Sequence, residues 1–156
     1  MKKHTLHIIG VMLAAVLLCC ACSTTKRLAD GEVLYTGLKK FEVHGTDGEK
    51  LPSGMVGNIK SAGNVKPNNP MPFLSPYVRT PFPVGLWVYN NWNDSAKGLE
   101  GWLYRKLVSQ PVLVSDVKPE LRTQMMERIL DNNGYFGSTA SYEVLPDKRN
   151  PKKARI

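Results

Sequence analysis

The residues whose types could do acid–base or metal chemistry are few, and His44, Asp47 and Glu49 are the set closest together. They lie in or just after a polar, glycine-rich stretch that is typical of a turn. Because we expect His4 and His7 to leave with an N-terminal signal segment, His44 would be the one histidine of the mature chain. A single imidazole supplies neither a two-histidine zinc site nor a Ser–His relay with a second histidine. We therefore predict no catalytic site, no metal, no cofactor and no enzyme.

The cysteines form the second chemically notable group, and Cys19, Cys20 and Cys22 all lie near the N-terminus. Residues 1–21 have a basic start and an apolar run too short for a membrane span, which is the layout of a secretory signal peptide. The pair Ala21-Cys22 resembles the lipobox of bacterial lipoproteins, although Cys19 stands where that family usually has leucine. The resemblance implies cleavage between Ala21 and Cys22, with S-diacylglycerol and N-palmitoyl groups on Cys22. A plain signal peptide or a retained N-terminal anchor is the alternative.

The acylated Cys22 would place the protein in the outer membrane, lipid-anchored and facing the periplasm. Three acyl chains exceed the two signals that a stable anchor needs. Loss of Lys2 and Lys3 leaves 19 of the 21 basic residues against 13 acidic ones, a net charge of +6. Because no nucleic-acid-binding motif accompanies this charge, we expect no nucleic-acid partner.

Among the elements that would position any site, the main one expected is an amphipathic helix over residues 118–133. Its apolar stripe recurs every third or fourth residue and consists of Val117, Leu121, Met125, Met126, Ile129 and Leu130. Pro119 suits the first turn, and Asn132, Asn133 and Gly134 end the helix. Tyr135 and Phe136 follow as apolar anchors. We expect a strand over 138–145, with Met125 and Ile129 packed against Phe41 and Tyr142.

Weaker patterns fill the rest of the chain. Six prolines between residues 63 and 83 predict an ordered loop without regular structure. Leu99, Trp102, Leu103 and Leu107 predict one buried helix face. In order, the expected elements are a first strand (35–43), a weak helix (51–62), the proline-rich loop (63–83), an apolar run (86–92), a helix (97–109), a turn (146–151) and a last strand (152–156).

Several runs are similar to one family. RTQMMERILDNNGYF (122–136), followed by a strand, a Pro/Lys turn and KKARI (152–156), is similar to the POTRA repeats of the BamA/TamA outer-membrane assembly family. With the lipobox, KPNNP (66–70) and RTPFPVGLWVYN (79–90), the chain looks like the N-terminal region of TamL-type lipoproteins.

The resemblance implies an α+β fold with a single POTRA-like β-α-α-β-β domain. Its parts would be a signal peptide (1–21), a tether (22–34) and the domain (35–156), with an insertion (63–117) and an incomplete last strand. Full members continue to a membrane barrel, so we expect an N-terminal fragment of a larger protein.

We therefore expect a binding module that adds a strand from outer-membrane protein clients or assembly-machinery subunits. Its edge would be Ser138, Thr139, Ala140, Ser141, Tyr142, Glu143 and Val144. One alternative is a sugar-binding or enzymatic lipoprotein that uses Trp87, Tyr89, Trp92 and Trp102, residues that core packing would also explain. Another is a non-functional truncated remnant.

Overall fold

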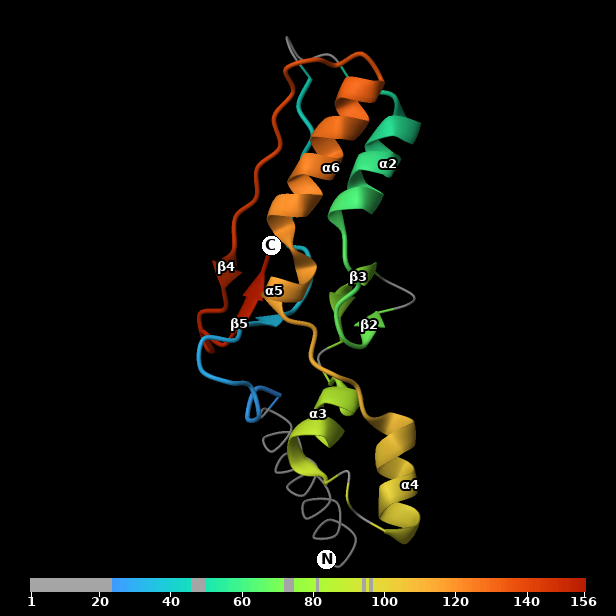
Figure 1. Cartoon of the computed structure of the whole chain (residues 1–156), viewed down its shortest axis with the longest axis vertical. Helices are drawn as coiled ribbons and strands as arrows, with labels where there is room; N and C mark the ends of the chain where they lie inside the picture. The colour runs from blue at the N-terminus through green and yellow to red at the C-terminus, as the bar shows by residue number, and fades with distance from the viewer. Residues whose placement is uncertain (1–23, 46–49, 72–74, 81, 94, 96) are drawn as a thin grey trace, which may run out of the picture. The chain divides into compact units, whose positions relative to one another are not determined.

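A computed structural model describes residues 24–45, 50–71, 75–80, 82–93, 95 and 97–156 (Figure 1). The expected signal peptide, Ala21, Cys22, Asp47 and Glu49 lie outside these residues. The chain divides into two compact units, Met1–Arg27 with Pro81–Gln110 and Leu28–Thr80 with Pro111–Ile156. The α+β class is confirmed. The expected single domain over 35–156 becomes two units, and the expected insertion is narrower, because residues 63–80 belong with the sheet.

The larger unit is built on a sheet of β1 (Leu34–Tyr35), β5 (Lys153–Arg155) and β4 (Leu145–Pro146), in the order β1-β5-β4. β5 is therefore the middle strand, parallel to β1 and antiparallel to β4. Leu34 pairs with Lys153, and Leu145 pairs with Arg155. The predicted turn before the last strand is confirmed. Leu34, Tyr35 and Ala154 are almost fully buried, so the sheet is the centre of this unit.

Helices α2 (Ser53–Gly63), α5 (Val114–Val117) and α6 (Pro119–Asn132) complete the core, and α2 packs along α6 (Figure 1). The predicted limits of α6 are confirmed, with Pro119 in its first turn and Gly134 at φ +88° after its end. Ile59 of α2 and Leu130 of α6 are buried together with Val117 of α5.

The predicted buried face of α6 is partly wrong. Leu121 and Met125 are exposed, whereas Thr123 is buried and Met126 lies against α2 at Gly63. The side that faces α2 follows Thr123, Met126 and Leu130, a spacing of three and four residues that is as helical as the predicted one. Phe136, expected to be an anchor, is 83% exposed, while Tyr135 is half-buried.

The proline-rich loop contains strands that its composition did not predict. β2 (Pro70–Met71) and β3 (Ser75–Arg79) pair antiparallel with a register shift. Proline is tolerated here because a two-stranded ribbon leaves one edge of each strand without a ladder partner. β3 also supports the chain after β1, since the Leu38 N–H donates to the Tyr77 carbonyl at 3.2 Å.

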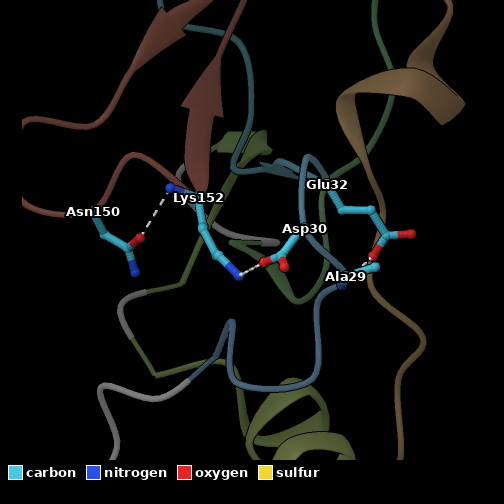
Figure 2. Close-up of polar contacts among 5 residues, drawn as sticks. All are labelled: Ala29, Asp30, Glu32, Asn150 and Lys152. Carbon is cyan, nitrogen blue, oxygen red and sulfur yellow. Dashed lines mark hydrogen bonds and ion pairs between the residues drawn. The ribbon is translucent and has the colours of Figure 1, made fainter.

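Residues 24–33, the described part of the expected tether over 22–34, pack against the rest of the chain instead of forming a free tether. Thr24 and Leu28 are buried, and Leu34 already begins β1. Figure 2 shows how the turn before β1 is fastened to the turn before β5. The Ala29 N–H donates to Glu32 Oε2 at 2.9 Å, and Lys152 Nζ lies 3.5 Å from Asp30 Oδ1. The Lys152 N–H donates to Asn150 Oδ1 at 3.0 Å.

The smaller unit contains α3 (Val84–Asn91) and α4 (Gly98–Leu107), which pack on each other. Leu86 and Val88 of α3 are almost fully buried. Gly85 allows the close approach, because an added Cβ would lie 2.9 Å from the Leu107 carbonyl oxygen. The predicted helix over 97–109 is confirmed, but its predicted buried face is wrong, since Gly101 and Tyr104 are the buried positions of α4.

Within the described part of the chain, no helix is both long enough and apolar enough to span a membrane.

Candidate functional site

A cavity of about 870 Å³ lies in the larger unit between two extended segments, residues 38–45 and 137–143. We call it the sheet groove. Side chains of α2 and α6 complete its lining, among them Ile59, Met126 and Leu130. Ile156, directly after β5, stands at one end. The lining therefore begins where the middle strand of the sheet ends.

The order of the strands explains why the groove exists. β1 and β4 are the outer strands, so the segments that continue them begin about two strand spacings apart, roughly 9–10 Å. Ile156, directly after β5, donates its N–H to the Gly37 carbonyl at 3.3 Å. The Ile156 carbonyl accepts from the Lys39 N–H at 2.8 Å. Both outer segments line the groove, together with Ile156.

Along both walls, some backbone groups have no hydrogen-bond partner among the described residues. Residues 40–45 and 141–143 make no backbone hydrogen bond to any other described residue. Unpaired N–H and C=O groups of extended chain favour the addition of another strand. The groove thus offers two such walls instead of the single edge predicted at residues 138–144.

The predicted strands over 35–43 and 138–145 are both shorter than expected. β1 ends at Tyr35, and within residues 138–146 only Leu145–Pro146 is paired as a strand, so Ser138–Val144 is not a strand. A strand needs a ladder partner, and among the described residues the pairing with β5 covers Leu34–Tyr35 on one side and Leu145–Pro146 on the other.

Carboxylates of α6 hold the 138–144 segment in place of a strand partner. The Ala140 N–H donates to Glu127 Oε1 at 2.8 Å, and the Tyr142 hydroxyl donates to Glu120 Oε1 at 2.7 Å. The hydrogen bond to Glu120 raises the pKa of Tyr142 above its ordinary value. The sequence pattern predicts Glu120 and Glu127 as solvated surface charges, so it misses this role.

The groove changes from apolar at its floor to charged at its rim. Burial of Tyr35 at the floor raises the pKa of its phenol to about 12. At the rim, a hydrogen bond from Lys40 lowers the pKa of Glu42. His44 Nε2 lies 4.0 Å from Glu42 Oε2, and its side chain is mostly exposed. Such a lining suits a peptide with one apolar and one polar side.

The remaining predicted candidates do not assemble into a site of their own. Of the trio His44, Asp47 and Glu49, only His44 is described, and no group of three potential metal ligands occurs among the described residues. The four aromatic residues do not form one exposed surface. Trp87 and Trp92 pack edge to face with ring centroids 6.0 Å apart and are half-buried, whereas Trp102 is exposed. Tyr89 instead lies 6.0 Å from the guanidinium carbon of Arg27.

Comparisons with protein-family models, with curated proteins and with solved structures find no match.

Proposed function

We propose that the protein is a non-catalytic binding module that accepts one extended polypeptide strand in the sheet groove. The observation that carries the proposal is the pair of walls with unpaired backbone groups at the end of β5. In strand addition, main-chain hydrogen bonds supply affinity, and pockets for alternate side chains supply selectivity. A strand in the groove could bond to both walls, which a strand at an exposed sheet edge cannot do.

We place the added strand in the direction of β5. In line with β5, it would run parallel to residues 38–43 and antiparallel to residues 138–144. The Asp147 N–H donates to the Lys153 carbonyl. In an antiparallel pair, every second residue points its N–H and C=O groups at the partner strand. Counted in steps of two from Asp147, the backbone groups of Glu143 and Ser141 would therefore point into the groove. Ala154 is the buried residue of β5, so every second side chain of the added strand would face the helices.

The location and the clients follow from the resemblance to TamL-type lipoproteins and belong to the same proposal. We propose an outer-membrane protein that faces the periplasm, held by acyl groups on Cys22. Its clients would be outer-membrane proteins or subunits of their assembly machinery. The chain would be the N-terminal part of a larger barrel protein, whose residues after Ile156 would compete with a client for the same groove. Acyl labelling of the Cys22→Ala variant tests the anchor separately, because undiminished label would contradict attachment at Cys22.

Site-specific photocrosslinking tests the groove. In the purified full chain, p-benzoylphenylalanine replaces Tyr142, which lines the groove, or Phe136, which is exposed six residues away and does not. The probes are a peptide that alternates valine with lysine and a peptide of the same composition with its valines in one block. We expect crosslinking of the alternating peptide at position 142 and little at position 136.

Two results would contradict strand addition. One is equal capture at positions 142 and 136, and the other is equal capture of the alternating and blocked peptides at position 142. The same pair of positions, used in cells that express the full chain, then tests the proposed clients. Position 142 should crosslink outer-membrane proteins or assembly subunits that position 136 does not.

A further inference from the structure

Helix α4 has two apolar sides, and only one of them packs within the protein. Gly101 and Tyr104 are buried. Leu99 is 73% exposed, Trp102 is 52% exposed and Leu107 is 43% exposed. We call these three residues the α4 outer face. Large apolar side chains exposed together on one surface often mark an interaction surface.

The helical spacing places the outer face away from the packed side. At about 100° per residue, Trp102, Leu99 and Leu107 span an arc of roughly 140°, with the half-buried Leu103 inside it. Tyr104 and Gly101 lie outside this arc. The outer face therefore follows one side of the helix, and the exposed Lys106 lies inside the same arc in the last turn, as in basic amphipathic helices that lie in a membrane interface.

The charge around the outer face is basic. Arg105 and Lys106 end α4, Lys97 precedes it, and all three are exposed. Residues 23–27 and 81–110 hold five basic residues against two acidic ones, a net charge of +3. Self-association through this face would bring like charges together, which disfavours a second copy of the chain as its partner. Anionic lipid head groups match the charge instead.

We propose that the α4 outer face lies against an anionic lipid surface, with Leu99, Trp102 and Leu107 in the interface and the basic residues among the head groups. Tryptophan suits this position because its ring is apolar and its N–H remains near water. The chain also keeps this unit near the expected lipid. Cys22 precedes Arg27 by five residues, a span of at most about 18 Å.

Arg27 is fastened to α3, on which α4 packs. Its N–H donates to Asn90 Oδ1 at 2.9 Å, and its Nη1 donates to the Tyr89 carbonyl at 2.7 Å. A bilayer that holds the N-terminus is therefore within reach of the helix pair. The proposal is independent of strand binding, because no residue of the sheet groove belongs to the outer face.

Depth-dependent fluorescence quenching tests the proposal with the full chain. The protein is added to vesicles of phosphatidylcholine with phosphatidylglycerol, in which the phosphatidylcholine is brominated near its head group, and flotation confirms attachment. The spectrum of the Trp102→Phe variant, subtracted from that of the unchanged chain, isolates the emission of Trp102. We expect strong quenching of Trp102, and a severalfold weaker effect in vesicles of phosphatidylcholine alone or at high salt.

Trp87→Phe is the matched control, since Trp87 is half-buried on α3 and its emission should be quenched much less. The Leu99→Ser and Leu107→Ser double variant alters only exposed residues and should reduce quenching of Trp102 without unfolding the protein. Floating protein whose Trp102 emission is unquenched would overturn the proposal. Failure to float with anionic vesicles would also overturn it. Equal quenching in vesicles with and without phosphatidylglycerol would refute the electrostatic part.

Discussion

The guanidinium of Arg122 donates from Nη1 to the carbonyl oxygen of Ala62 at 2.9 Å, which fastens α6 to the last turn of α2. Its Nε donates to the carbonyl oxygen of Val117, the last residue of α5, at 2.7 Å. The final carbonyls of a helix have no partner within the helix, so a cation there is favourable. One side chain thus joins three helices beside the sheet groove.

Replacement of Arg122 by lysine should destabilise the larger unit. Lysine carries a compact ammonium and cannot reproduce the planar fork that serves both carbonyls. We expect the free energy of unfolding to fall by about 1.5–3 kcal/mol, the range for hydrogen bonds to charged groups, measured by urea denaturation. Arg128→Lys, at an exposed position of the same helix, should change it by less than about 0.5 kcal/mol. Equal effects of the two substitutions would contradict the bridging role of Arg122.

Gly37 should not tolerate a side chain. Its φ of +122° disfavours every other residue, and an added Cβ would overlap the carbonyl oxygen of Tyr77. We expect Gly37→Ala to lower the free energy of unfolding by about 3 kcal/mol. Gly31→Ala is the matched control, because Gly31 has φ +87° but open space around its Cα. Gly31→Ala should lower the free energy of unfolding by about 1 kcal/mol. A similar loss at both positions would show that the contact with Tyr77 is unimportant.

Loss of the Tyr142–Glu120 hydrogen bond should loosen the 138–144 wall of the groove. In Glu120→Gln, we expect the amide of Ala140, whose N–H donates to Glu127 Oε1, to exchange severalfold faster while the core of α6 stays protected. The pKa of Tyr142, raised by this carboxylate, should fall toward its ordinary value, which ultraviolet titration can follow. Asp131→Asn, which removes a carboxylate charge at the exposed end of the same helix, is the matched control and should leave both quantities unchanged. Unchanged exchange in Glu120→Gln would show that the hydrogen bond does not hold the wall.

Tyr35 should make the fold sensitive to alkali. Burial raises the pKa of its phenol from 10.0 to about 12, so the folded state binds this proton more tightly than the unfolded state does. The resulting stability is complete below pH 10 and is lost as the pH rises through about 12. Tyr35→Phe should flatten the dependence of unfolding free energy on pH in that window. An equally steep dependence in the variant would assign the effect to other groups.

The sequence predicted the elements that local signals define. Pro119 and Gly134 mark the limits of α6, and the prolines at 146 and 151 mark the turn between β4 and β5. It did not predict the lengths of the strands, because a strand extends only as far as its partner does. Nor did it predict which side of α6 is buried, since the stripe through Met125 and the stripe through Met126 both have helical periodicity.

The site was predicted in part. Residues 138–143 do line the groove, as the expected edge suggested, but the opposite wall at 38–45 was expected to be a paired strand. The contacts of Glu120 and Glu127 could not be inferred from the sequence. A carboxylate on a helix is predicted to face solvent unless a distant segment of the chain is known to approach it. The α4 outer face was misassigned to the core for a related reason: an apolar stripe does not identify what covers it.

The position of β5 in the middle of the sheet constrains when the protein can fold. Thr36 donates from Oγ1 to the Ala154 carbonyl across 118 residues of chain, and β5 pairs with both outer strands of the sheet. During synthesis, β1 emerges long before its partner has been translated, so this sheet cannot assemble on a nascent chain that still lacks Lys153–Arg155. Until then the earlier helices and strands of this unit lack the middle strand of their sheet, which predicts slow, late formation of the sheet.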